Sequence, residues 1–178
     1  MSDTRLFKFL DRGGVGCFSG RVWSLPEGGV PGAWMRSVGA IDPCRDGVHV
    51  CRAEDLAHWA AGELYEAEIA GAVCDAPDSV IAERARLVRE VADWPVIARE
   101  AVARSRARAA ALPPSDPVTT YLGELDAFAA RAEWAVALYC GAMAFAAHAD
   151  PTGRDGDRTR AAFREERARQ SRDIAERC

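Results

Sequence analysis

Four side chains that bind metals or act as nucleophiles and bases lie in the segment PCRDGVHVCRAEDLAHW, residues 43–59. They are Cys44, His49, Cys51 and His58. Thiolates and imidazoles are preferred ligands of zinc, but structural zinc sites usually space paired ligands by roughly two to four residues. The pattern here, Cys-x4-His-x-Cys, departs from that spacing and makes these residues weak metal candidates. A disulfide between Cys44 and Cys51 across a tight turn is a further alternative.

The segment also fits an ordinary strand over residues 48–51 that follows a turn. Val48 and Val50 then face the core, and His49 and Cys51 share the opposite face. Same-face neighbours on a strand lie about 7 Å apart, so His49 is too far from Cys51 to take its proton directly. A nucleophilic thiol would need a base from elsewhere, such as His58.

A pair of carboxylates marks the segment ELYEAEIAG. The alternation over 63–71 predicts a half-buried strand with Glu66 and Glu68 on one face. Two carboxylates at the mouth of a cleft could hold a ribose or stabilise a cationic transition state. A solvated acidic face is the alternative. The candidate catalytic residues are therefore His49, Glu66 and Glu68, on the condition that His49 and Glu66 share a cavity.

Tryptophans are concentrated in the first half of the chain. Four of the five come before residue 95, at Trp23, Trp34, Trp59 and Trp94. Tryptophans either line an aromatic ligand pocket or fill a small core. For a pocket, the candidate substrate-binding residues are Trp23, Trp59 and Arg21.

The elements that must position these residues differ between the two halves. The first half is rich in Gly, Trp, Val and turn residues, and the second in Ala, Arg and Glu. Strands are expected over 5–10, 17–26, 48–51 and 63–71, strand or helix over 33–41 and 85–94, and a short helix over 52–62. We place the boundary between the two halves at Trp94-Pro95. The sequence therefore predicts an α+β fold, with a β-rich domain over 1–94 and a helical segment over 95–178.

The helical segment is expected to hold about three helices. Proline and capping signals place them over 95–112, 118–148 and 158–177. Apolar residues recur at steps of three and four from Val118 to Ala146, which predicts one helix contacted on two sides.

Composition bounds the class of protein. The chain has 178 residues, 49% apolar and 28% charged, which is typical of a soluble globular protein. Its net charge of −4 gives no reason to expect nucleic acid. No apolar run reaches the roughly 18 residues of a membrane span, and the start, MSDTRLFKFLDRGG, does not have the pattern of a signal peptide. We expect a cytoplasmic protein whose six cysteines are free thiols.

Two resemblances add to this reading. The segments LFKFL, PCRDGVHVC, RAEDLAHW, LYEAEIAG and ARLVREV resemble a group of uncharacterised bacterial and phage proteins with a CxxGxHxC strand and a YEVExxG strand. That group implies no activity. RLVREVADW is similar to a late strand of small ADP-ribosyltransferases of the rifampin-modifying kind, which implies a related scaffold and NAD as cofactor. Where that family has an HGT-type motif, this chain has KFLDRGG, so either His49 substitutes or the NAD site is absent.

Two functions of different classes follow. The first is a small-molecule cleft in the β-rich half, and its most specific version is an enzyme of transferase type. In that version NAD is favoured over zinc as the cofactor. The second is a non-catalytic interaction protein that forms a homodimer or binds a partner through its helical half. The wide apolar stripe of 118–148 suggests the second, because short flanking helices would not cover it.

Overall fold

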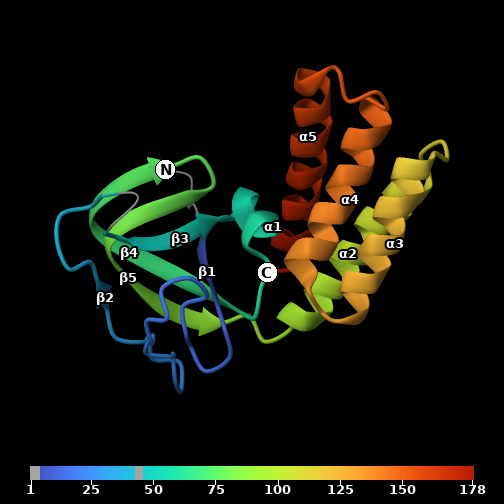
Figure 1. Ribbon diagram of the computed structural model, residues 1–178. Coiled ribbons are helices and arrows are strands. Elements are labelled where there is room, and N and C mark those ends of the chain that lie inside the picture. Colours follow the sequence, from blue (N-terminus) through green and yellow to red (C-terminus); the bar gives the residue numbers. More distant parts are fainter. Residues whose placement is uncertain (1–4, 43–45) are drawn as a thin grey trace. The chain divides into compact units, whose positions relative to one another are not determined.

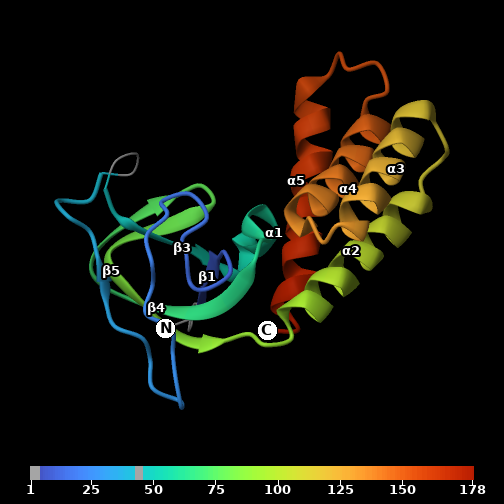
Figure 2. The same cartoon turned by 60° about the horizontal axis from the view of Figure 1, so that its bottom comes forward.

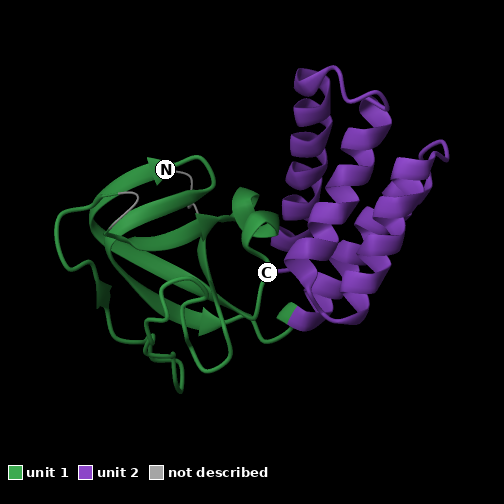
Figure 3. Ribbon diagram, in the orientation of Figure 1, with its two compact units in different colours: residues 1–94 green, residues 95–178 purple. Residues whose placement is uncertain are grey.

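The computed structural model describes residues 5–42 and 46–178. The chain divides into two compact units, Met1–Trp94 and Pro95–Cys178, coloured separately in Figure 3. The strands lie in the first unit and four α-helices in the second, so the fold is α+β as predicted. No helix in the described part of the chain is long and apolar enough to span a membrane.

The first unit is built on an antiparallel sheet that closes on itself (Figures 1 and 2). Its strands are β1 (Leu6–Leu10), β2 (Met35–Arg36), β3 (Val48–Arg52), β4 (Glu63–Ala76) and β5 (Ser79–Glu90). β1 pairs with both β3 and β4, and β5 also pairs with both, so these four strands form a ring. The two-residue strand β2 adds to the edge of β5.

The inner face of the ring is apolar. Strand alternation turns every second side chain inward, and the buried ones form one cluster. Its members are Leu10, Trp23, Val48, Val50, Tyr65, Ala67, Val80, Ala85 and Leu87. The prediction that Val48 and Val50 lie in the core is therefore confirmed. Between β3 and β4 the chain forms a 3-10 turn, Ala53–Asp55, and the short helix α1, Leu56–Trp59, in place of the longer helix expected over 52–62.

Two strand predictions need correction. Residues 17–26 form no strand and contribute only an isolated bridge between Val15 and Val22. The strand expected over 63–71 continues to Ala76, and a two-residue turn leads directly into β5. The register shifts between Ala70 and Val73, where Gly71 has a φ of +83°. Gly71, the last residue of the predicted strand, therefore marks an irregularity within a longer strand.

The second unit contains α2 (Trp94–Ala110, beginning at the last residue of the first unit), α3 (Asp116–Ala130), α4 (Trp134–Ala149) and α5 (Gly156–Ala175). The single helix predicted over 118–148 is wrong, because α3 and α4 are separate helices that pack against one another. The apolar stripe is thus divided between two facing helices. The interaction hypothesis loses the observation that suggested it and stays a prediction.

The break between α3 and α4 is a helix end without a glycine. The amide of Glu133 donates to the carbonyl of Phe128, and that of Ala132 donates to the carbonyl of Ala129. These two bonds form a Schellman motif, which needs a left-handed residue after the helix. Ala132 takes that conformation, with φ of 57°. Glycine is the residue that usually marks this motif in a sequence. Because alanine stands here instead, the apolar pattern predicted one continuous helix through the break.

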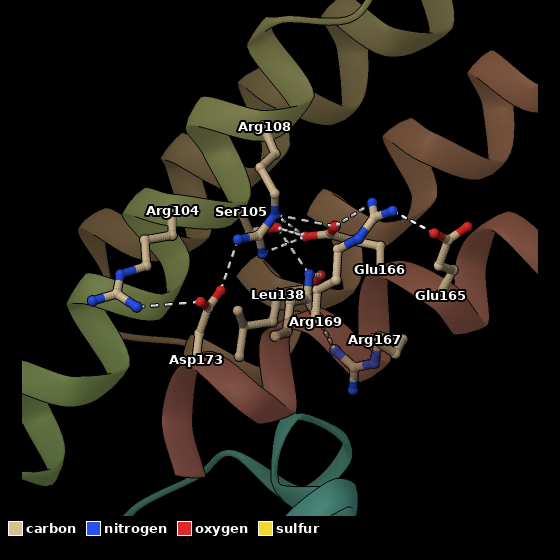
Figure 4. A network of polar contacts seen from close by, with 10 residues as sticks. Arg104, Ser105, Arg108, Leu138, Glu165, Glu166, Arg167, Arg169 and Asp173 are labelled. Atoms are coloured by element: carbon tan, nitrogen blue, oxygen red, sulfur yellow. Dashed lines mark hydrogen bonds and ion pairs between the residues drawn. The ribbon is translucent and has the colours of Figure 1, made fainter. Parts of the chain in front are cut away.

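The second unit buries a polar network between α2, α4 and α5 (Figure 4). Glu166 is fully buried; it accepts hydrogen bonds from the Ser105 hydroxyl at 2.9 Å and from Nη2 of Arg108 at 2.8 Å. Gln170, also fully buried, donates to the Ser105 hydroxyl at 2.9 Å and to the carbonyl of Leu138 at 2.8 Å. These bonds fix α5, which has few apolar residues, to its neighbours.

Candidate functional site

The two predicted catalytic carboxylates are engaged with arginines of the neighbouring strand. Glu66 lies opposite Arg89 and accepts from its Nε at 3.0 Å and its Nη2 at 2.5 Å. Glu68 lies opposite Arg86 and accepts from its Nε at 2.8 Å. Each carboxylate is thus held in a cross-strand ion pair on the outer face of the sheet. This arrangement fits the alternative of an acidic surface face better than a catalytic pair, with an arginine as the partner of each glutamate.

His49 is not close to these carboxylates. It lies on β3, whereas Glu66 lies on β4, and β1 separates the two strands. Two strand spacings amount to about 10 Å, beyond a hydrogen bond. The fully buried Phe7 of β1 lies opposite Glu66 on one side and Cys51 on the other. Burial, and the nearby Lys8 charge, lower the pKa of His49.

The weak metal candidates do not form a cluster in the described residues. Cys51 is buried, and its thiol donates to the carbonyl of Phe7 at 3.4 Å. His58 is exposed on α1. Cys44 lies outside the described residues. Within residues 5–42 and 46–178, no group of three or more His, Cys, Asp or Glu residues is placed to hold a metal ion.

The predicted substrate-binding residues serve different parts of the first unit. Trp23 is buried in the core of the ring. The indole Nε1 of Trp59 donates to the carbonyl of Asp78 at 2.7 Å, which ties α1 to the turn between β4 and β5. The guanidinium of Arg21 is exposed and donates to the carbonyl of Arg36 at 2.8 Å. These three side chains do not converge on one pocket.

Trp34 lies in a different cluster, on the outer face of β2 and β5. Ala85 and Leu87 point into the ring, so Arg84 and Arg86 point outward from β5. The ring centroid of Trp34 lies 5.2 Å from Cζ of Arg84 and 4.8 Å from Cζ of Arg86. Both distances are within the range of cation–π interactions.

Arg36 adds a third guanidinium to this surface. It is exposed and lies directly opposite Arg84 in the β2–β5 pairing. Like charges in directly opposite cross-strand positions destabilise a sheet. On its other side Arg84 lies opposite Ala70, which offers no charge. We refer to Trp34, Arg36, Arg84 and Arg86 as the Trp34 surface.

The charges on this sheet are balanced unevenly. Arg86 and Arg89 each have a glutamate partner, Glu68 and Glu66. Within the described parts of the chain, neither Arg36 nor Arg84 forms an ion pair with a carboxylate. The Nε of Arg84 is buried, and no described residue accepts a hydrogen bond from it. A buried donor of this kind is satisfied in most proteins by a protein group, water or ligand.

A shallow depression adjoins the Trp34 surface and shares Arg36 with it. Its volume is about 360 Å³, and its lining includes Ser37, Ile41, Ala72 and Glu83 besides Arg36. The carboxylate of Glu83 accepts the amide of Ala72 at 3.1 Å. The lining of the depression is therefore mixed in polarity and carries both a guanidinium and a carboxylate.

Only a weak signal for this surface is present in the sequence. Arg86 belongs to the segment 85–94, which could be either strand or helix, and Arg84 lies just before it, so their common face was not predicted. β2 has only two residues, too few for an alternation pattern to be recognised. Trp34 was recognised only as one of four tryptophans near each other in sequence.

Comparisons with protein-family models, with curated proteins and with solved structures gave no match to this chain. A function must therefore be argued from the arrangement of its own residues.

Proposed function

We propose that this protein binds a small molecule carrying an oxyanion, a phosphate or carboxylate group, at the Trp34 surface. The observation that supports this most is the directly opposed pair of Arg36 and Arg84, without a carboxylate partner among the described residues, on a sheet that provides partners for Arg86 and Arg89. An oxyanion between the two guanidiniums would remove their repulsion and accept charge-assisted hydrogen bonds.

The surroundings favour a small ligand over a bare ion. The planar ring of Trp34 and the depression beside Arg36 offer apolar and polar contacts next to the charged pair. NAD, implied by the resemblance to ADP-ribosyltransferases, contains phosphates and is one molecule of this class. Catalysis by His49, Glu66 and Glu68 stays a prediction, since their separation offers it no geometric support.

Binding can be measured by titration calorimetry with inorganic phosphate, citrate, adenosine monophosphate, adenosine and NAD. Phosphate and citrate distinguish the two kinds of oxyanion, and adenosine tests whether the anion is needed. We expect binding of an anionic probe that weakens as ionic strength rises. Arg84→Gln should weaken it by about tenfold or more, because a charge-assisted hydrogen bond is lost.

Arg89→Gln is the matched control. It removes the same charge from the same strand but leaves Arg36 and Arg84 in place, so it should change the affinity by less than about threefold. Equal losses in the two variants would mean that only net charge matters and would contradict the proposal. Binding of adenosine as tight as that of its monophosphate, or much tighter binding of a single-stranded oligonucleotide, would also contradict it.

A further inference from the structure

Glu83 places a fixed carboxylate in the depression that also contains Arg36. It is an exposed residue of β5 and directly precedes Arg84 in the chain. Its backbone carbonyl accepts the amide of Ser37 at 2.8 Å, and its carboxylate accepts the amide of Ala72 at 3.1 Å. Both donors also line the depression, so Glu83 is bonded to two other parts of the lining.

Gly71 leaves the space that this carboxylate occupies. A Cβ added at Gly71 would overlap the carboxylate of Glu83 and would lie 2.9 Å from its Cβ. The φ of +83° at Gly71 is also one that other residues rarely adopt. The side chain of Glu83 is therefore held against the backbone of β4 by contact as well as by a hydrogen bond.

The opposite charges of this depression do not neutralise one another. Arg36 and Glu83 both line it, yet within the described residues they form no ion pair, whereas Glu66 and Glu68 of β4 both pair with arginines of β5. The bond to Ala72 does not need the negative charge, because a glutamine oxygen would accept the same amide. A guanidinium and a separate carboxylate thus face one small volume.

We infer that the ligand of the Trp34 surface is a zwitterion that carries an ammonium group besides its oxyanion, an inference that rests on the proposed function. The oxyanion binds Arg36 and Arg84, whose buried Nε has no acceptor among the described residues. The ammonium binds the carboxylate of Glu83, so both ends meet an opposite charge. A ligand with only an oxyanion is repelled by Glu83. Glu83 is then the residue that determines specificity at this site.

Paired probes test this by nuclear magnetic resonance titration of the full chain. Aminoalkyl phosphates of increasing chain length are compared with hydroxyalkyl phosphates of the same length, in which a hydroxyl replaces the ammonium. Amino acids with a terminal ammonium form a second arm, since the oxyanion can be a carboxylate. We expect the best ammonium probe to bind about fivefold more tightly than its hydroxyl partner. It should also shift the amide resonance of Ala72, which is bonded to Glu83.

Glu83→Gln should reduce this preference to less than about twofold while the amide of Ala72 keeps its acceptor. Glu90→Gln is the matched control, because it removes the same charge from an exposed position of the same strand, and it should leave the preference unchanged.

The outcomes separate this inference from the proposed function. Phosphate probes that bind through Arg84 with no preference for the ammonium, or a preference that the two glutamine variants reduce equally, would overturn the zwitterion alone. Absence of binding by every probe, or binding that Arg84→Gln leaves unchanged, would overturn the proposed function and the zwitterion together.

Discussion

The two units fill their interiors in opposite ways. The ring of the first unit encloses apolar side chains, with Leu10 and Leu87 fully buried. The second unit buries Glu166 and Gln170 just as completely. Its helices are rich in alanine and arginine, so they supply few large apolar side chains, and hydrogen bonds from charged groups take that place. The interior of the first unit is thus mainly apolar, whereas that of the second combines small apolar side chains with polar side chains that are hydrogen-bonded to one another.

The largest expected effect comes from removing the centre of the polar network. Glu166→Ala leaves the buried Ser105 hydroxyl without its acceptor, takes one of two carboxylate partners from Arg108, which keeps Asp173, and opens a cavity. The unsatisfied donor and the cavity together should cost about 3 kcal/mol. We expect hydrogen exchange to accelerate across α2, α4 and α5, with β1 and β3 unaffected.

The adjacent residue provides the control for this variant. The side chain of Glu165 is 65% exposed and pairs with Arg169 on the surface. Glu165→Ala should change the free energy of unfolding by no more than about 0.5 kcal/mol. A loss of similar size in both variants would show that the network contributes no more than a surface ion pair.

The first unit should show the complementary response. Leu87→Ala removes a fully buried side chain from the ring, which costs about 3 kcal/mol through lost burial and the cavity left behind. Exchange should accelerate in β1, β3, β4 and β5 but not in α4 and α5. Acceleration in both units together would mean that they unfold as one, and the comparison of two separate interiors would fail.

A smaller effect tests how closely the polar network is packed. A Cβ added at Gly141 would lie 2.4 Å from the hydroxyl of Ser105 and 3.3 Å from Nε2 of Gln170. Gly141→Ala should therefore destabilise the second unit by about 1–3 kcal/mol, despite the higher helix propensity of alanine.

Ser105→Ala removes the atom that the new methyl group meets first. The double variant should accordingly lose less stability than the sum of the two single variants, with a difference of at least about 0.5 kcal/mol in chemical denaturation. Strict additivity would indicate that Gly141 and Ser105 are not in contact.

The sequence predicted the α+β class and the strands β1 and β3, because short runs of apolar and β-branched residues between turn residues are typical of strands. It also placed Glu66 and Glu68 correctly on one face of their strand. It could not predict that Arg89 and Arg86 lie opposite them, because cross-strand register joins residues that are far apart in the chain. Arg36 and Arg84 were missed for the same reason. The alternation of residues along one strand thus predicts which side chains share a face. Which charged side chains lie opposite one another depends on the pairing between strands, which the alternation does not show.

The smallest expected effect concerns the end of α3, which the sequence pattern did not predict. Ala132 holds a left-handed conformation, which costs an L-residue about 1–2 kcal/mol and glycine almost nothing. Ala132→Gly should therefore stabilise the second unit by about 1 kcal/mol, after part of the gain is offset by the greater freedom of glycine in the unfolded chain.

Ala127, an exposed residue inside α3, provides the matched control. Ala127→Gly should cost about 1 kcal/mol, since a glycine within a helix only adds unfolded-state entropy. Opposite signs from the same substitution five residues apart, measured by urea denaturation, would establish that the break after Ala130 is fixed by the backbone of Ala132. Destabilisation by both would instead indicate that α3 and α4 are continuous in solution, as the apolar pattern of the sequence suggested.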